Sequence, residues 1–231
     1  MNFVDVLKNI PIVGYVFFGL FLVASIIQVA LAALDKDELR RKEKTFCLLF
    51  LMVFVIVTIP TKPILYIAVF FSMLGDLLLV SKKKMPFYIG SFSFAASHIL
   101  YLVSLILIVG NHLQWWIYLI AFVVAVLFYL ASTNLIAKRL TQNKFEQYTM
   151  MGYFSILFFN FLVMILSTTA IPLYLFITAI GGFMFVISDS ILVYNKFYKP
   201  IKKAEVLVMS TYLIAQALIV IGMLLTIITL N

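Results

Sequence analysis

Apolar residues in this chain form long unbroken runs, and the short segments between the runs hold most of the charged residues. The runs do not alternate with polar residues, as half-buried strands would. In lipid, backbone polar groups must be paired within a helix or a closed barrel, and a helix crosses the bilayer with about 20 mostly apolar residues. The pattern therefore predicts an all-α polytopic membrane protein. We expect a single bundle of eight transmembrane helices, over residues 11–33, 45–60, 63–81, 86–109, 114–137, 148–167, 171–194 and 204–229.

Two prolines separate the second predicted helix from the third. Pro60 and Pro63 flank Thr61-Lys62, and a proline inside a helix removes a hydrogen bond and clashes with the preceding turn. We therefore expect residues 45–81 to form two short helices and not one long helix. The eight helices and their loops use the whole chain, so we expect one domain over residues 1–231 without a soluble appendage.

The composition supports a membrane protein. Of the 231 residues, 65% are hydrophobic and 11% are charged, whereas soluble domains have about 45–50% and about 25%. A water-soluble fold of this length could not bury so much apolar surface. The first run, 11–33, is longer than the apolar region of a secretory signal peptide, so we interpret it as the first membrane helix. The single cysteine, Cys47, excludes an intramolecular disulfide.

Lysine and arginine are distributed unevenly between the loops. All but two of the 17 Lys and Arg residues lie in the loops after the first, third, fifth and seventh predicted helices, and only Lys8 and Lys62 lie on the opposite side. Basic loops stay in the cytoplasm, which puts both termini on the non-cytoplasmic side. Topology thus explains the net charge of +8. Because the charge is explained in this way, we expect no nucleic-acid partner. The sequence also implies no protein partner. Without organellar signals, we expect a multi-pass protein of the cell membrane, the inner membrane of a bacterium.

Only two of the nine acidic residues lie well inside apolar runs. A charge at the bilayer centre costs about 2.5–3.5 kcal/mol, so such acids are candidates for function. Asp76 precedes Lys82 by six residues and Asp189 precedes Lys196 by seven, which puts both carboxyl groups roughly 9–10 Å from the basic edge at about 1.5 Å per residue. Two acids at one depth on two helices can converge on one site. In the alternative interpretation, each acid forms a hydrogen bond that only holds the bundle together.

Further polar residues recur at helical spacing within the apolar runs. Ser72 lies four residues before Asp76, and Tyr153 lies seven before Asn160. Such faces should point into the bundle, where hydrogen bonds between helices are their usual role. Gly181 and Gly182 would allow two helices to approach closely. The candidate binding residues on these faces are His98, Tyr101, Asn160, Ser188, Tyr212 and Gln216.

Several familiar catalytic motifs are absent. The sequence contains no G-x-S-x-G, no P-loop and no H-E-x-x-H, and one intramembrane histidine, His98, cannot build a multi-histidine zinc site. Ser188 and Asp189 are adjacent, so they point to different faces of a helix and do not form a nucleophile–base pair. The two aspartates remain the main candidates for chemistry.

Four sequence blocks resemble those of the YhhN-like, lysoplasmalogenase-like membrane proteins. They are Gly75-Asp76-Leu77-Leu78-Leu79, the G-x-x-x-F-x-x-x-H-x-x-Y pattern of residues 90–101, the G-x-x-x-F-x-x-S-D-x-x-L pattern of residues 181–192, and Thr211-Tyr212-Leu213-Ile214-Ala215-Gln216. Thr61-Lys62-Pro63 also fits the family, whereas the first two predicted helices match only by hydropathy. The resemblance implies eight helices and hydrolysis of the vinyl-ether bond of lysoplasmalogens to a fatty aldehyde and glycerophospho-ethanolamine or -choline.

The implied reaction fits two carboxyl groups. Vinyl-ether hydrolysis begins with transfer of a proton to the β-carbon, which creates an oxocarbenium ion that water then attacks. In glycoside hydrolysis, a pair of carboxyl groups supplies the proton and stabilises a similar oxocarbenium-like transition state. We predict Asp76 and Asp189 as the catalytic pair, with the choice of acid left open. The scheme requires no metal and no cofactor, and its partners are a lysophospholipid substrate and membrane lipids. His98, Tyr101, Tyr212 and Gln216 would orient the headgroup or water, and Asn160 and Ser188 would also line the substrate site.

Two other functions fit the same residues. In a small proton- or cation-coupled transporter, the two aspartates would relay protons or bind a cation. Transport predicts access from both faces and flux without product formation. A lipid-binding or assembly protein without chemistry predicts that aspartate substitutions change only folding or abundance.

Overall fold

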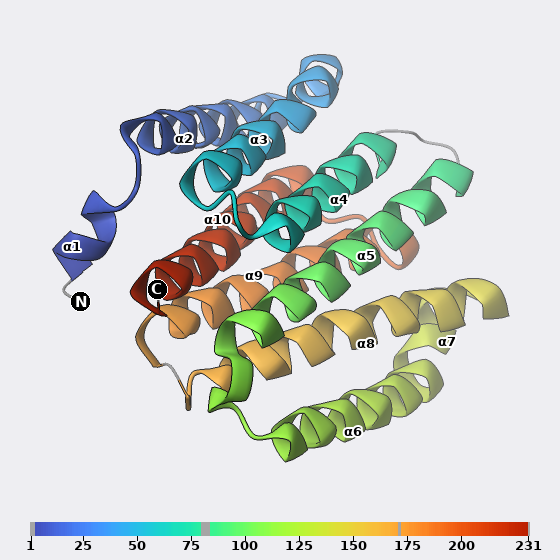
Figure 1. Ribbon diagram of the computed structural model, residues 1–231. Coiled ribbons are helices and arrows are strands. Elements are labelled where there is room, and N and C mark those ends of the chain that lie inside the picture. The colour runs from blue at the N-terminus through green and yellow to red at the C-terminus, as the bar shows by residue number, and fades with distance from the viewer. Residues whose placement is uncertain (1–2, 80–83, 171, 231) are drawn as a thin grey trace.

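The computed structural model describes residues 3–79, 84–170 and 172–230, and the described residues are helical apart from their turns (Figure 1). Helices cover each predicted apolar segment except for a residue or two at some ends, such as Ile59 and Pro60. Residues 80, 81 and 171 of these segments, and Lys82, lie outside the described residues. The helices are α1 (Phe3–Lys8), α2 (Ile12–Ala33), α3 (Asp37–Thr58), α4 (Pro63–Leu79), α5 (Lys84–Val109), α6 (Trp115–Ser132), α7 (Lys138–Leu140), α8 (Lys144–Ser167), α9 (Pro172–Phe197) and α10 (Ala204–Leu230), with a 3-10 turn, η1 (Gly110–His112), and a π turn, η2 (Thr133–Ala137).

The chain is an all-α polytopic membrane protein. Six of its described helical segments are long and apolar enough to cross a membrane, and α4 is a shorter apolar helix. The six are α2, Met85–Val109 of α5, Trp115–Leu140 (α6 with η2 and α7), α8, Leu173–Phe197 of α9, and α10.

The prediction that residues 37–44 form a loop was wrong. They form the first two turns of α3, which begins at Asp37, eight residues before the predicted start. Glutamate, lysine and arginine are good helix formers, so a helix continues through this charged segment although its hydropathy is low. Similarly, α8 begins at Lys144 and not at the predicted residue 148. The side chain of Asn143 caps this start by accepting a hydrogen bond from the backbone of Phe145 (2.9 Å). As a result, Lys44 projects from a helix and not from a loop.

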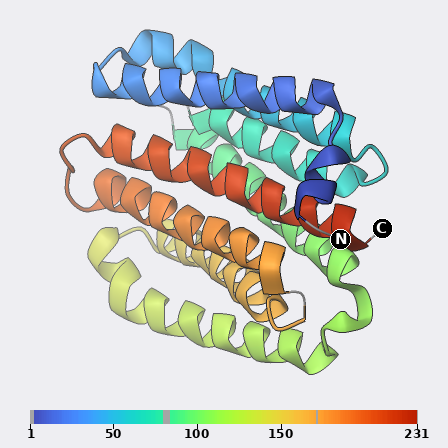
Figure 2. The same cartoon turned by 90° about the vertical axis from the view of Figure 1, so that its left-hand side faces the viewer.

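Seven helices form a closed series in which each packs against the next (Figures 1 and 2). The order is α2, α3, α4, α5, α8, α9 and α10, and α10 returns to pack against α2. Helix α6 lies outside this series, against α8. The two ends of the chain lie at the same end of the bundle. Helices α4, α9 and α10, which carry the candidate site residues Asp76, Asp189 and Tyr212, thus belong to one series.

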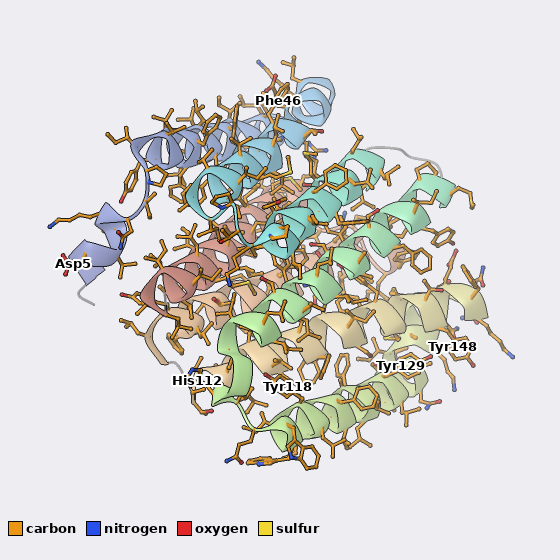
Figure 3. All side chains as sticks on the ribbon, in the orientation of Figure 1. Asp5, Phe46, His112, Tyr118, Tyr129 and Tyr148 are labelled. Atoms are coloured by element: carbon orange, nitrogen blue, oxygen red, sulfur yellow. The ribbon has the colours of Figure 1, made fainter. Side chains whose placement is uncertain are left out.

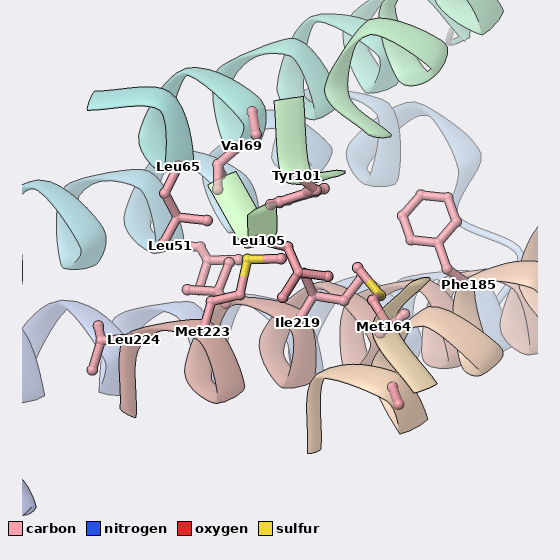
Figure 4. Packing of buried hydrophobic residues seen from close by; sticks show 14 of the residues in the cluster. Leu51, Leu65, Val69, Tyr101, Leu105, Met164, Phe185, Ile219, Met223 and Leu224 are labelled. Carbon is pink, nitrogen blue, oxygen red and sulfur yellow. The ribbon is translucent and has the colours of Figure 1, made fainter. Parts of the chain in front are cut away.

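Buried side chains from several helices gather around α10 (Figure 4). Leu105 of α5, Ile219 and Met223 of α10, and Met164 of α8 are fully buried there. Large apolar side chains also cover the outside of the bundle (Figure 3), and Ile12, for example, is 83% exposed. Such a surface suits a lipid environment, because soluble proteins rarely expose large contiguous apolar patches.

Helices α9 and α10 approach closely at glycine, as the sequence indicated for Gly181. A Cβ atom at Gly181 would lie 2.7 Å from the backbone nitrogen of Ile219 and 2.9 Å from the backbone oxygen of Ala215. Contacts this short do not occur with real Cβ atoms, so α9 and α10 can pack at this distance only because residue 181 lacks a side chain.

Candidate functional site

Asp76 lies in the interior of the bundle, where two other helices supply its partners. Its side chain is 3% exposed, and the Lys44 Nζ of α3 lies 2.9 Å from its Oδ1. The Tyr212 hydroxyl of α10 donates a hydrogen bond to its Oδ2 (2.9 Å). Both oxygens of this α4 carboxyl group therefore accept from donors on neighbouring helices. The sequence predicted a buried acid here, but it did not predict its cationic partner.

A hydrogen-bond network continues from this carboxyl group along α10. The Gln216 side chain lies within 3.5 Å of the Tyr212 hydroxyl and donates to the Ser72 hydroxyl (2.9 Å). Its oxygen accepts from the Tyr101 hydroxyl (2.7 Å), and Ser72 shares a hydrogen bond with Ser97 (2.7 Å). Three of the predicted binding residues, Tyr101, Tyr212 and Gln216, are thus linked to Asp76. The network joins α4, α5 and α10.

Asp189 is the second buried carboxyl group, and it is 7% exposed. The Tyr153 hydroxyl of α8 donates a hydrogen bond to its Oδ2. Asp189 interacts electrostatically with Asp76 and with Lys44, so the two carboxyl groups share one region of the bundle. The assignment of both acids to one catalytic site stays a prediction.

Aromatic rings connect the surroundings of the two aspartates. The ring of Tyr212 packs edge to face against Phe94 of α5 and Phe185 of α9, with centroid distances of 5.9 and 5.4 Å. Phe185 lies four residues before Asp189 on α9 and is fully buried (Figure 4). Because edge-to-face packing fixes ring orientation, these contacts hold the Tyr212 hydroxyl in place beside Asp76.

His98 and Asn160 form a separate buried pair. The Asn160 amide nitrogen lies 3.1 Å from the His98 Nδ1 and donates to the His98 backbone oxygen (2.9 Å). Both side chains are 2% exposed, and within the described residues the His98 Nε2 and the Asn160 Oδ1 have no hydrogen-bond partner. The His98 ring packs against Phe185 at 4.3 Å and against Tyr101 at 6.1 Å. The pair therefore adjoins the network without a hydrogen bond to either aspartate.

Ser188 is buried, and its hydrogen bond goes to the backbone of α10 one turn before Tyr212. Its hydroxyl donates to the backbone oxygen of Val208 (3.2 Å), which ties α9 to α10. No contact of its hydroxyl with either aspartate is found in the described part of the chain. Its predicted part in substrate binding stays a prediction, as do the roles of the other candidate residues.

Sequence reasoning missed Lys44 and Ser97 and did not include Tyr153 in the site. Lys44 was assigned to a cytoplasmic loop because it ends a charged run, although it is also the last charged residue before the apolar part of α3. Tyr153 was noted only for its spacing to Asn160. Within the described residues, no three His, Cys, Asp or Glu side chains lie close enough together to share a metal ion.

A large apolar cavity lies elsewhere, between α2 and α10. Its volume is about 610 Å³, within the range of about 300–1,000 Å³ that is typical of ligand sites. On α10 its walls include Ser210, Ile214 and Ala217. These residues share a helix face that is opposite to the face of Tyr212 and Gln216. The cavity is therefore separated from the network by α10 itself.

The fold and the site define a polytopic helical membrane protein with two buried carboxyl groups, of which Asp76 belongs to a polar network. The chain belongs to the YhhN family, whose model matches residues 39–223, and this family includes lysoplasmalogenases. The match begins within α3 and covers all the candidate site residues. No curated protein and no solved structure matches the chain.

Proposed function

We propose that this protein is a membrane-embedded hydrolase that cleaves the vinyl-ether bond of lysoplasmalogen or a related ether lysolipid. The observation that carries this proposal is the pair of buried carboxyl groups, Asp76 and Asp189, which come from different helices and interact electrostatically. Family membership supports it, because the YhhN family includes lysoplasmalogenases.

The reaction needs one carboxyl group as a proton donor and a second that stabilises positive charge. Transfer of a proton to the β-carbon of the vinyl ether leaves an oxocarbenium ion, and a carboxylate beside it lowers the energy of this intermediate. Water then adds to the cationic carbon and loses a proton to a carboxylate. The hemiacetal collapses to a fatty aldehyde and the free hydroxyl of the glycerophospho headgroup.

The remaining polar residues would bind and orient the reactants. Tyr212 and Gln216 are hydrogen-bonded next to Asp76, where they can orient a water molecule or the ether oxygen. Within the described residues, the His98 Nε2 and the Asn160 Oδ1 have no hydrogen-bond partner, so they can bind a polar group of the substrate or a water molecule. Tyr101 orients Gln216 through its hydroxyl, and Ser188 supports α9 beside Asp189.

In the proposed topology all eight long helices cross the membrane, with α3 and α4 as short spans and both termini on the non-cytoplasmic side. The basic loops then lie in the cytoplasm. The membrane that holds the protein is the cell membrane, which in a bacterium is the inner membrane. The lysophospholipid would keep its phosphate at this basic interface and extend its alkenyl chain into the bundle. Cations attract anionic headgroups by about 1 kcal/mol each.

Mass spectrometry of the reaction products tests the function. Purified protein is incubated with lysoplasmalogen and with the matched acyl lysolipid, beside Asp76→Asn and Asp189→Asn at equal folded amounts. We expect aldehyde from the vinyl-ether lipid alone and its loss in both variants. Product formation by both variants would refute the mechanism. If the folded wild type forms no product but carries a proton or cation flux in liposomes, the protein is instead a small proton- or cation-coupled transporter that uses the two aspartates.

A further inference from the structure

We infer that Lys44 is a positioning residue of this site: it holds Asp76 as the charged carboxylate and so leaves the role of proton donor to Asp189. This assignment of roles rests on the proposed function, whereas the charge state of each aspartate can be measured without a substrate. The two carboxyl groups have unequal partners.

The partners of Asp76 are donors at both oxygens. The Lys44 ammonium, 2.9 Å from Oδ1, can only donate, and the Tyr212 hydroxyl donates to Oδ2 from 2.9 Å. A proton on Oδ1 would face the Lys44 ammonium, which has no acceptor for it, and would displace the lysine. The geometry therefore fits an ionised carboxylate whose charge is balanced by an ammonium group.

Asp189 has a different environment. Its Oδ2 accepts from Tyr153, and among the described residues no cation lies within ion-pair distance of it. The charges with which it interacts are the more distant Asp76 and Lys44, which together form a neutral pair. A buried carboxyl group without its own counter-ion is more stable in the neutral form, and a neutral carboxyl group can donate a proton.

Helix α3 holds Lys44 in this position. Lys44 lies on the buried face of α3, because Cys47, Leu48 and Leu51, at three, four and seven residues further on, are fully or almost fully buried. Its side chain is only 12% exposed, in contrast to the 74% exposed side chain of Lys8. A cation that lies in the bundle interior and contacts a buried acid is distinct from the loop cations that set topology.

These charges assign each step of the proposed reaction. Asp189 gives its proton to the β-carbon and becomes a carboxylate. The carboxylate of Asp76 stabilises the oxocarbenium ion and accepts a proton from the attacking water. Transfer of that proton from Asp76 to Asp189 restores both groups. Among the described residues, the Lys44 ammonium is paired with Asp76, so it sets the charge of this group.

Infrared difference spectroscopy of the protein in bilayers at neutral pH tests the assignment. The wild-type minus Asp76→Asn difference spectrum should contain a carboxylate band, which the variant lacks. The wild-type minus Asp189→Asn difference spectrum should contain the carbonyl band of a protonated acid. In Lys44→Met the carboxylate band of Asp76 should be replaced by a protonated carbonyl band. Lys44→Arg should keep the wild-type spectrum, as should the control Lys8→Met, which removes an exposed lysine 3.8 Å from Asp5.

Two results would overturn the inference. The first is a protonated Asp76 in the wild type, and the second is an Asp76 that stays ionised in folded Lys44→Met. If the wild type has no hydrolase activity, the proposed function fails, but the infrared bands still decide the charge assignment. If the wild type is an active hydrolase, Lys44→Met should lower kcat by about 10²-fold, the lower limit for loss of acid–base catalysis, with little change in KM. Lys44→Arg should retain most of the wild-type kcat.

Discussion

The close packing of α9 against α10 can be tested by adding a single methyl group. Gly181→Ala would put a Cβ atom 2.7 Å from the Ile219 nitrogen and 2.9 Å from the Ala215 oxygen. Both atoms belong to the backbone of α10, so no side-chain rotation can relieve the contacts. The two helices would have to separate or shift. Asp189 lies eight residues after Gly181 on the same helix, so the shift should also disturb the site.

The size of the effect follows from two opposing terms. Overpacking of a close-packed interior costs about 1–3 kcal/mol, and a clash with rigid backbone belongs at the upper end of this range. Alanine in place of glycine stabilises a helix by about 1 kcal/mol. We therefore expect a net loss of about 2 kcal/mol in the free energy of unfolding, the difference of these two terms. For a chain of this length, this corresponds to a melting temperature lower by about 4–8 °C.

The chain offers both a matched control and a convenient assay. A Cβ atom at Gly152, in α8, would have no neighbour within 4 Å, so Gly152→Ala should be neutral or slightly stabilising. The single cysteine, Cys47, is 1% exposed and reacts with a thiol-specific fluorescent dye only when the bundle opens. Thermal scans with this dye in detergent give the melting temperatures. Equal melting temperatures for the two alanine variants would refute the close approach of α9 and α10.

Three further predictions concern hydrogen bonds and ion pairs. Tyr153→Phe removes the hydroxyl that donates to Asp189 and should lower the rate of the proposed hydrolysis by about tenfold, equivalent to about 1.4 kcal/mol. The control Tyr148→Phe, at an exposed position, should leave this rate unchanged. Gln216→Leu leaves the buried Tyr101 hydroxyl without its acceptor, whereas Ser72 keeps its hydrogen bond with Ser97, so the variant should lower stability by about 1–3 kcal/mol, measured in the same thermal scans. The Arg40–Glu205 ion pair (2.8 Å) includes a 48% exposed carboxylate, so a double-mutant cycle should give a coupling energy below about 1 kcal/mol.

The sequence predicted most of the helices because each apolar run specifies its own helix. It predicted the start of α3 wrongly, because a charged amphipathic turn and a charged loop have the same low hydropathy. The six-residue helix α1 was not predicted, since it lies outside the apolar runs. The number of membrane crossings and the position of the termini stay predictions, because they depend on the bilayer as well as on the chain.

The candidate site was predictable where helical spacing alone places residues on one face. Tyr212 and Gln216 are four residues apart, and both join the network around Asp76. The contact between Lys44 and Asp76 joins residues 32 positions apart on two helices, so it depends on how those helices pack. The pairing of His98 with Asn160, 62 positions apart, was missed for the same reason.

The hydrogen bonds of Asp76 also bear on how the chain is inserted during biosynthesis. Tyr212 follows Asp76 by 136 positions and Gln216 follows Ser72 by 144, so α10 leaves the ribosome long after α4. During this interval Lys44, which is synthesised first, can neutralise the aspartate through their ion pair of 2.9 Å. A nascent chain that stalls before Ala204 would present Ser72 and Tyr101 to lipid without Gln216.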